Sequence, residues 1–181
     1  MASCLTPYIV KHNGDEQPVP CGKCPACMKR RISGWSFRLM QEYKRCHSAH
    51  FITLTYDTKH VPITDKGFMA LSKRDVQLFF KRLRKAHTKE QLSDNPIKYY
   101  VAGEYGGRTN RPHYHIILFN AVLELIQPAW NLGSVHYGEV NEASVGYTLK
   151  YMCKPARIPL HANDDRQPEF SLMSKGLAAT T

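Results

Sequence analysis

The chain has 181 residues, 43% of them hydrophobic and 22% charged, which fits one domain with a sizeable core and excludes wholesale disorder and collagen-like repeats. Its 25 Lys and Arg against 15 Asp and Glu give a net charge of +10, which favours an anionic partner, most often nucleic acid. No stretch approaches the roughly 18 apolar residues of a membrane span, and the N-terminus lacks a secretory signal. We therefore expect a cytoplasmic protein without a membrane partner, whose six cysteines are thiols or metal ligands rather than disulfides.

Apolar periodicity predicts both helices and strands, in this chain order: a helix over residues 33–47, a strand over 50–56, a helix beginning after Ser72, strands over 97–103, 113–119 and 134–140, and a helix over 143–154. Ser72 is typical of an N-cap, with Asp75 at the third helical position. The strand over 113–119 is apolar after its histidines, so we expect it to be central in its sheet. Because strands and helices do not alternate regularly, the predicted fold class is α+β, with a central, mainly antiparallel sheet flanked by helices.

Three parts of the chain are expected. They are a Cys-rich N-terminal segment over residues 1–32, a core over 33–160, and an irregular, polar C-terminal segment over 161–181. The polar stretch 12–20 marks the clearest internal boundary, because it separates the first cysteine from the cysteine cluster.

Two histidines, His113 and His115, are the sharpest chemical feature. Side chains at positions i and i+2 of a strand point to the same face, so both imidazoles can reach one divalent metal ion. Glu104 ends the preceding strand, and a chain reversal across residues 106–112 would bring its carboxylate opposite them. Two imidazoles and a carboxylate with open positions are typical of a catalytic metal site, for which a carboxylate also suits Mg or Mn. The alternative is a pair of partly exposed strand histidines.

Two tyrosines, Tyr147 and Tyr151, lie one helical turn apart on the last predicted helix. Lys150 and Lys154 each follow a tyrosine by three residues. A phenol is a poor nucleophile until a metal-bound phosphate or a lysine assists it, so the pair offers two nucleophiles for two successive transfers. The alternative is an amphipathic helix with half-buried aromatics and solvated lysines.

Three cysteines at two-residue spacing, Cys21, Cys24 and Cys27, resemble a metal knuckle that needs a fourth ligand. Cys4 is the candidate, with Cys46 or His12 in reserve. Four thiolates leave no open position, so we expect a structural zinc site; unliganded buried thiols are the alternative.

Two basic runs complete the candidate functional residues. The first holds seven Lys and Arg against one Asp: Lys73, Arg74, Lys81, Arg82, Arg84, Lys85 and Lys89. The second, residues 23–45, holds seven more against Glu42. Runs of one sign can follow a phosphate backbone, with aromatic side chains stacking on bases, whereas solvated helix faces are the ordinary alternative.

Three segments occur in the order of the motifs of HUH endonucleases: Phe51-Ile-Thr-Leu-Thr55, Arg111-Pro-His-Tyr-His115 and Tyr147-x-x-Lys150-Tyr151. Together with the Cys-Gly-x-Cys-x-x-Cys segment and Gly103-Glu-Tyr-Gly106, they make the chain resemble the replication initiators of gokushovirus-type Microviridae, which are small phages with circular single-stranded DNA. The resemblance covers roughly residues 4–176, and three ordered motifs are far more specific than one.

The resemblance implies a rolling-circle replication initiator with the HUH fold, working in the cytoplasm of the host bacterium. It implies that Glu104, His113 and His115 bind Mg or Mn, and that Tyr147 or Tyr151 attacks single-stranded origin DNA, leaving a 5′-phosphotyrosine and a free 3′-OH. The second tyrosine would rejoin the displaced strand. Lys150 would stabilise charge or help to take the phenolic proton, and Arg111 is expected among the DNA-binding residues. A host polymerase and helicase are the implied partners.

Two departures accompany the resemblance. Relatives often continue beyond residue 176, so we expect a truncated or altered C-terminus and the loss of any helicase-recruiting surface there. No Walker-type nucleotide-binding motif is present, so unwinding would come from another protein. A zinc-stabilised nucleic-acid-binding regulator, a metal-dependent hydrolytic nuclease and a transposase of the same superfamily remain as alternatives.

Overall fold

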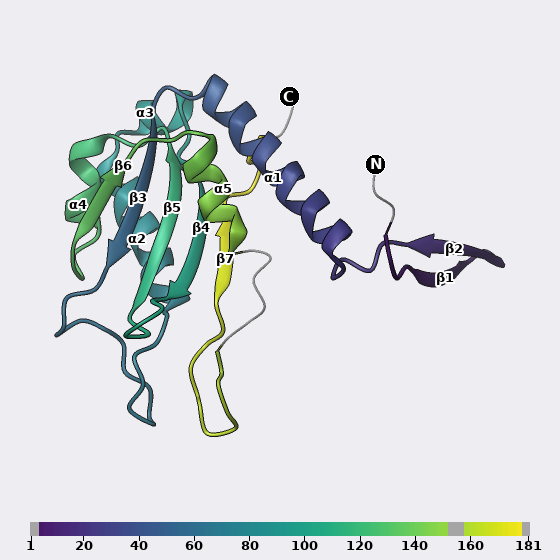
Figure 1. Ribbon diagram of the computed structural model, residues 1–181. Coiled ribbons are helices and arrows are strands. Elements are labelled where there is room, and N and C mark those ends of the chain that lie inside the picture. The colour runs from purple at the N-terminus through teal and green to yellow at the C-terminus, as the bar shows by residue number, and fades with distance from the viewer. Residues whose placement is uncertain (1–3, 152–157, 179–181) are drawn as a thin grey trace.

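The computed structural model describes residues 4–151 and 158–178, apart from the side chain of His12 (Figure 1). Within these residues, the centre of the fold is a five-stranded antiparallel sheet with the strand order β6-β3-β5-β4-β7. Its strands are β3 (Ala49–Thr55), β4 (Lys98–Tyr105), β5 (Pro112–Phe119), β6 (Val135–Gly138) and β7 (Phe170–Met173). The predicted α+β class with an antiparallel sheet is confirmed, and β5 is the middle strand, as its apolar sequence predicted.

Helices pack on both faces of the sheet, and alternate residues of β5 show which helix lies where. Ile117 and Phe119 pack with α1 (Pro25–Arg45) and α5 (Glu142–Lys150). Tyr114, Ile116 and Leu118 pack with α2 (Lys73–Ala86) and α4 (Ile126–Ala129). Because side chains alternate along a strand, His113 and His115 share the face of Ile117 and therefore lie on the α1 and α5 side.

Two helix starts illustrate how local sequence acts. The Ser72 hydroxyl accepts a hydrogen bond from the Asp75 backbone at 3.2 Å, which confirms the predicted N-cap of α2. Helix α1 begins at Pro25, eight residues before the predicted start at 33. Proline suits the first helical position because it needs no backbone donor there, and the preceding Cys24 is extended. The expected boundary between residues 32 and 33 thus falls inside α1.

Two strand segments were not predicted. Strands β1 (Tyr8–His12) and β2 (Asp15–Val19) form a hairpin where a polar boundary was expected. Asn13 and Gly14 make its turn with positive φ angles of 52° and 88°, which glycine and asparagine tolerate best. The hairpin lies beyond the N-terminal end of α1, away from the sheet (Figure 1). The C-terminal segment expected to be irregular supplies β7, which pairs with β4.

The remaining short elements are α3 (Lys89–Asp94) and the 3-10 turn Leu123–Leu125. The last predicted helix, 143–154, is observed as α5 up to Lys150, while Cys153 and Lys154 lie outside the described residues. Within the part of the chain that the structure describes, no helix is both long and apolar enough to span a membrane.

Candidate functional site

Pairing of β4 with β5 brings the predicted metal ligands together. Glu104 lies directly opposite His113, and Ala102 lies opposite His115, so the carboxylate faces both imidazoles across one strand gap. The Glu104 Oε1 atom lies 2.7 Å from His113 Nε2 and 2.9 Å from His115 Nε2. The expected chain reversal between the strands is present, and the three predicted ligands form one cluster.

The electrostatics of the cluster centre on a charged carboxylate. Burial raises the pKa of the Glu104 carboxyl, but hydrogen bonds and the charges of His113 and His115 outweigh burial and lower it to about 2. Glu104 and His115 are each only 6% exposed. A carboxylate that is buried and ionised in this way is a ready ligand for a cation.

The far nitrogens of both histidines are tied to the protein. His115 Nδ1 lies 3.0 Å from the Thr53 hydroxyl, and His113 Nδ1 lies 3.2 Å from the Arg111 carbonyl oxygen. These contacts hold both rings with Nε2 towards Glu104, as metal-binding histidines require. Thr53 was not singled out from the sequence as a site residue. The register would have identified it, because Thr53 lies opposite His115 in the β3–β5 pair.

The donor set fits a divalent cation. Each of the three residues offers one ligand atom, and these atoms lie within 4.8 Å of one another. Ligands at about 2.1 Å from an ion and at right angles to each other are about 3.0 Å apart, close to the observed separations between Glu104 and the two histidines. Two imidazoles with one carboxylate accept Mn and related ions and leave coordination positions open for a substrate.

Both tyrosines of α5 reach the same cluster. The Tyr147 ring lies 5.0 Å from the His115 ring in an edge-on arrangement, and the Tyr151 ring stacks on His115 at 5.6 Å. The Lys150 ammonium lies 3.7 Å from the centre of the Tyr147 ring and 5.0 Å from that of Tyr151. The helix thus brings two phenols and one cation to the metal-ligand cluster.

The two tyrosines differ in environment. Tyr147 is 40% exposed, whereas Tyr151, the last described residue before the gap, is half-buried. Burial, with the neighbouring Tyr147 and the Glu104 charge, raises the pKa of Tyr151 well above its usual range. Access from solvent therefore favours Tyr147.

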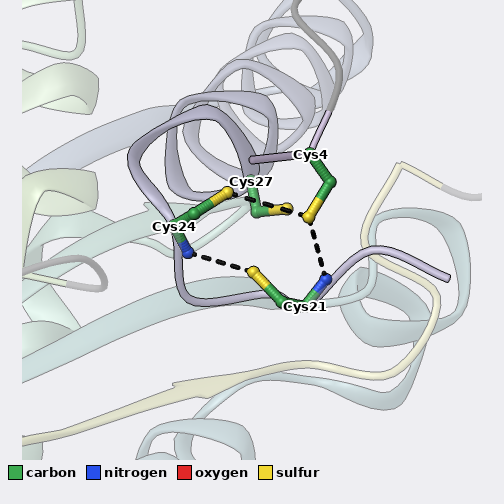
Figure 2. A group of neighbouring side chains, drawn as sticks. All are labelled: Cys4, Cys21, Cys24 and Cys27. Atoms are coloured by element: carbon green, nitrogen blue, oxygen red, sulfur yellow. Dashed lines mark hydrogen bonds between the residues drawn. The ribbon is translucent and has the colours of Figure 1, made fainter. Parts of the chain in front are cut away.

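The four predicted cysteine ligands also come together. Figure 2 shows Cys4, Cys21, Cys24 and Cys27 with their sulfur atoms turned towards one another at the N-terminal end of α1. The sulfurs of Cys4 and Cys24 are 3.9 Å apart, and a tetrahedral zinc with bonds of about 2.3 Å places its sulfurs about 3.8 Å apart. Neither reserve ligand belongs to this group: Cys46 ends α1, and the side chain of His12 lies outside the described residues.

Backbone and thiol contacts support ligation by this cluster. Cys21 Sγ accepts hydrogen bonds from the Thr6 hydroxyl and from the backbone of Lys23 and Cys24, which lower the pKa of Cys21 to about 5. The Gly22 backbone lowers the pKa of Cys27, but burial and the other thiols raise it to about 12. All four thiols can be ionised together only if a cation compensates their charge.

The predicted DNA-binding residues of α2 lie on the opposite side of the sheet from the tyrosines. Arg82 donates to the Ala129 carbonyl at 2.7 Å, and Arg84 lies over the rings of Phe80 and Tyr99. Lys73 lies over the Phe170 ring, while Arg74, Lys81 and Lys85 are exposed. Arg111, near the histidines, donates to the Tyr56 carbonyl oxygen.

Comparison with known proteins places the chain in a family. A family model for the phage replication-associated protein ORF2 matches residues 49–156, which include the Glu-His-His cluster and both tyrosines. The chain is 30% identical to replication-associated protein VP4 of Bdellovibrio phage phiMH2K, over 80% of this chain and 50% of the relative. It is also 30% identical to replication-associated protein ORF2 of Spiroplasma virus 4, over 94% of this chain and 57% of the relative.

A third relative, replication-associated protein ORF4 of Chlamydia phage 1, is 25% identical over 76% of this chain and 38% of its own length. The chain thus spans about half the length of the first two relatives. No solved structure gives a significant match. The resemblance to replication proteins of small phages, predicted from the motifs, is confirmed. The chain belongs to the family of the replication-associated protein ORF2.

Proposed function

We propose that this protein initiates rolling-circle replication by nicking single-stranded origin DNA through tyrosine transesterification, on a fold of the HUH endonuclease type. The observation that carries the proposal is the contact of both α5 tyrosine rings with His115, at 5.0 and 5.6 Å. A nucleophile must lie beside the group that orients the scissile phosphate, and this arrangement meets that condition.

The reaction exchanges one ester for another. The phenol oxygen of the attacking tyrosine forms a bond to phosphorus, and the bond from phosphorus to the 3′ oxygen breaks. The protein keeps the 5′-phosphate as a phosphotyrosine, the phenolic proton passes to solvent, and the released strand ends in a 3′-OH. A Mg or Mn ion held by Glu104, His113 and His115 would supply polarisation of the scissile phosphate.

Lys150 supports the attacking group. Its ammonium, 3.7 Å from the Tyr147 ring centre, favours the negative charge that develops on the phenol oxygen. Tyr147 is the more exposed tyrosine, and we assign the first attack to it. Tyr151, stacked on His115, would then attack the regenerated origin and allow the displaced strand to be closed.

The N-terminal cysteines hold a structural zinc ion in this proposal. Cys4 precedes the β1–β2 hairpin, whereas Cys24 and Cys27 belong to the start of α1, so the ion ties the N-terminus to the helix. The chain then consists of a Cys-rich segment over residues 1–32, a catalytic core over 33–160 and a C-terminal segment over 161–181. A host helicase and polymerase in the bacterial cytoplasm would unwind the DNA and extend the 3′-OH.

The test is covalent capture of DNA. End-labelled single-stranded DNA that carries the phage origin is incubated with Mn or Mg and the protein, then run on a denaturing protein gel. Wild type is compared with Tyr147→Phe, Tyr151→Phe and the double variant. We expect a metal-dependent shifted band that weakens most in Tyr147→Phe and is lost in the double variant.

Each alternative gives a different result. Cleavage without a shifted band would replace the proposal with a hydrolytic nuclease that uses water. Binding without cleavage at a verified origin would replace it with a zinc-stabilised regulator. A stronger loss in Tyr151→Phe than in Tyr147→Phe would reverse the order of the tyrosines.

A further inference from the structure

The outer surface of α1 carries charge of one sign. Its charged residues other than Glu42 are basic and exposed: Lys29, Arg30, Arg31, Arg38, Lys44 and Arg45. Glu42 is only 3% exposed and points into the body, where it accepts from Lys98 Nζ at 2.9 Å and from the Ala178 backbone at 2.8 Å. The single acid of the helix is therefore compensated internally, and the outer surface has no acidic side chain of its own.

An exposed aromatic ring lies within this basic surface. Phe37 is 65% exposed, although burying a phenylalanine is ordinarily favourable. It borders a shallow groove of about 570 Å³, whose other residues include Ser33, Met40, Gln41 and Lys44. Glu142, at the start of α5, is the acidic residue of this groove. A single ring among basic and polar side chains suits a stacked nucleic-acid base better than a lipid surface, which needs a continuous apolar stripe.

The position of α1 links this surface to the tyrosines. Helices α1 and α5 pack against each other on the same face of the sheet, with Leu39 of α1 in one cluster with Val145 and Leu149 of α5 (Figure 1). Helix α2, which carries the other basic run, packs on the opposite face with Tyr114 and Ile116. A strand that reaches Tyr147 can lie along α1 without passing around an edge of the sheet.

We infer that the outer surface of α1, and not that of α2, holds the single-stranded DNA that leads into the site. Phosphates contact Arg38, Lys44 and Arg45, and one base stacks on Phe37. This inference rests on the proposed function only in naming DNA as the partner, and it concerns binding rather than cleavage.

The test compares two variants with equal loss of charge. One replaces three basic residues of α1 (Arg38→Gln, Lys44→Gln, Arg45→Gln), and the other replaces three exposed basic residues of α2 (Arg74→Gln, Lys81→Gln, Lys85→Gln). Both are made in a Tyr147→Phe, Tyr151→Phe background, which excludes covalent attachment. Fluorescence anisotropy with labelled single-stranded DNA then measures affinity over a range of salt, and circular dichroism checks that the variants fold.

We expect the α1 variant to bind at least about tenfold more weakly, with the slope of log affinity against log salt reduced by about 2, because each single-strand phosphate contact contributes about 0.7. The α2 variant should lose less than about threefold, since its charges act only at long range. Equal losses, or a larger loss in α2, would overturn the inference. So would unchanged DNA binding by the α1 variant accompanied by lost binding to phosphatidylglycerol vesicles.

Phe37 provides a second readout. Phe37→Leu keeps an apolar side chain but removes the aromatic face, so we expect about five- to 100-fold weaker binding, the range found for one stacked base. Wild-type affinity in Phe37→Leu would rule out stacking there. If DNA binds through α1 but no adduct forms on the denaturing gel, the proposed nicking fails while this inference stands.

Discussion

Thr53 offers a sharp test of how the fold holds the metal ligands. Its hydroxyl lies 3.0 Å from His115 Nδ1, and β3 pairs with β5 at this position. Thr53→Val removes the hydroxyl and keeps the branched shape of the side chain. When His115 Nε2 binds a metal ion, Nδ1 carries the proton and needs an acceptor, which valine does not provide.

The expected magnitude follows from that lost contact. Removing the partner of a metal-binding histidine weakens metal binding about 10- to 100-fold, or about 1.4–2.7 kcal/mol. An ordinary hydrogen bond contributes about 0.5–1.5 kcal/mol, so the larger value reflects the loss of ring orientation as well. Isothermal titration with Mn measures the affinity directly, without a need for DNA.

Two variants serve as controls. Thr53→Ser keeps the hydroxyl and should restore most of the affinity. Thr55→Val lies two residues further along the same strand face, but its hydroxyl donates to the Ser134 carbonyl at 3.2 Å and not to a metal ligand. Metal affinity of Thr53→Val within about twofold of wild type, or an equal loss in Thr55→Val, would refute this role for the hydroxyl, because the contact should cost at least tenfold.

Three further outcomes are expected. Tyr114→Phe leaves the Ser72 backbone donor, 2.8 Å away in the buried network, without its acceptor; thermal denaturation should show a loss of about 2 kcal/mol and a Tm about 4–8 °C lower. Cys24→Ser should lower both zinc content and Tm, and an unchanged metal analysis would contradict the zinc site. His113→Ala or His115→Ala should abolish cleavage while DNA binding measured by anisotropy persists, and normal cleavage by either variant would remove the metal assignment.

Much of the sheet was predictable because its signals are local. The apolar run of β5 identified the central strand, and Ser72 identified the start of α2. The spacing of Glu104 and the two histidines anticipated their meeting, since alternation along a strand and one chain reversal suffice to bring them together. The cysteine spacing likewise anticipated the cluster of four thiols.

Other elements depended on partners that are distant in the chain. β7 is a four-residue edge strand without a clear pattern, and its pairing with β4 defines it. The β1–β2 hairpin did have a local signal, the Asn13-Gly14 turn, but the polar composition around it favoured a boundary. The hydroxyl of Thr53 became part of the site only through the register of β3 with β5.

The two basic helices show the limit of the sequence most clearly. By itself, the sequence determined that both runs are helical and positively charged, because charge and apolar periodicity are local properties. Only the tertiary structure decided that α1 lies with the tyrosines and α2 on the opposite face. The face that a helix covers is set by which side chains of the sheet it buries, and those contacts join residues far apart in the chain.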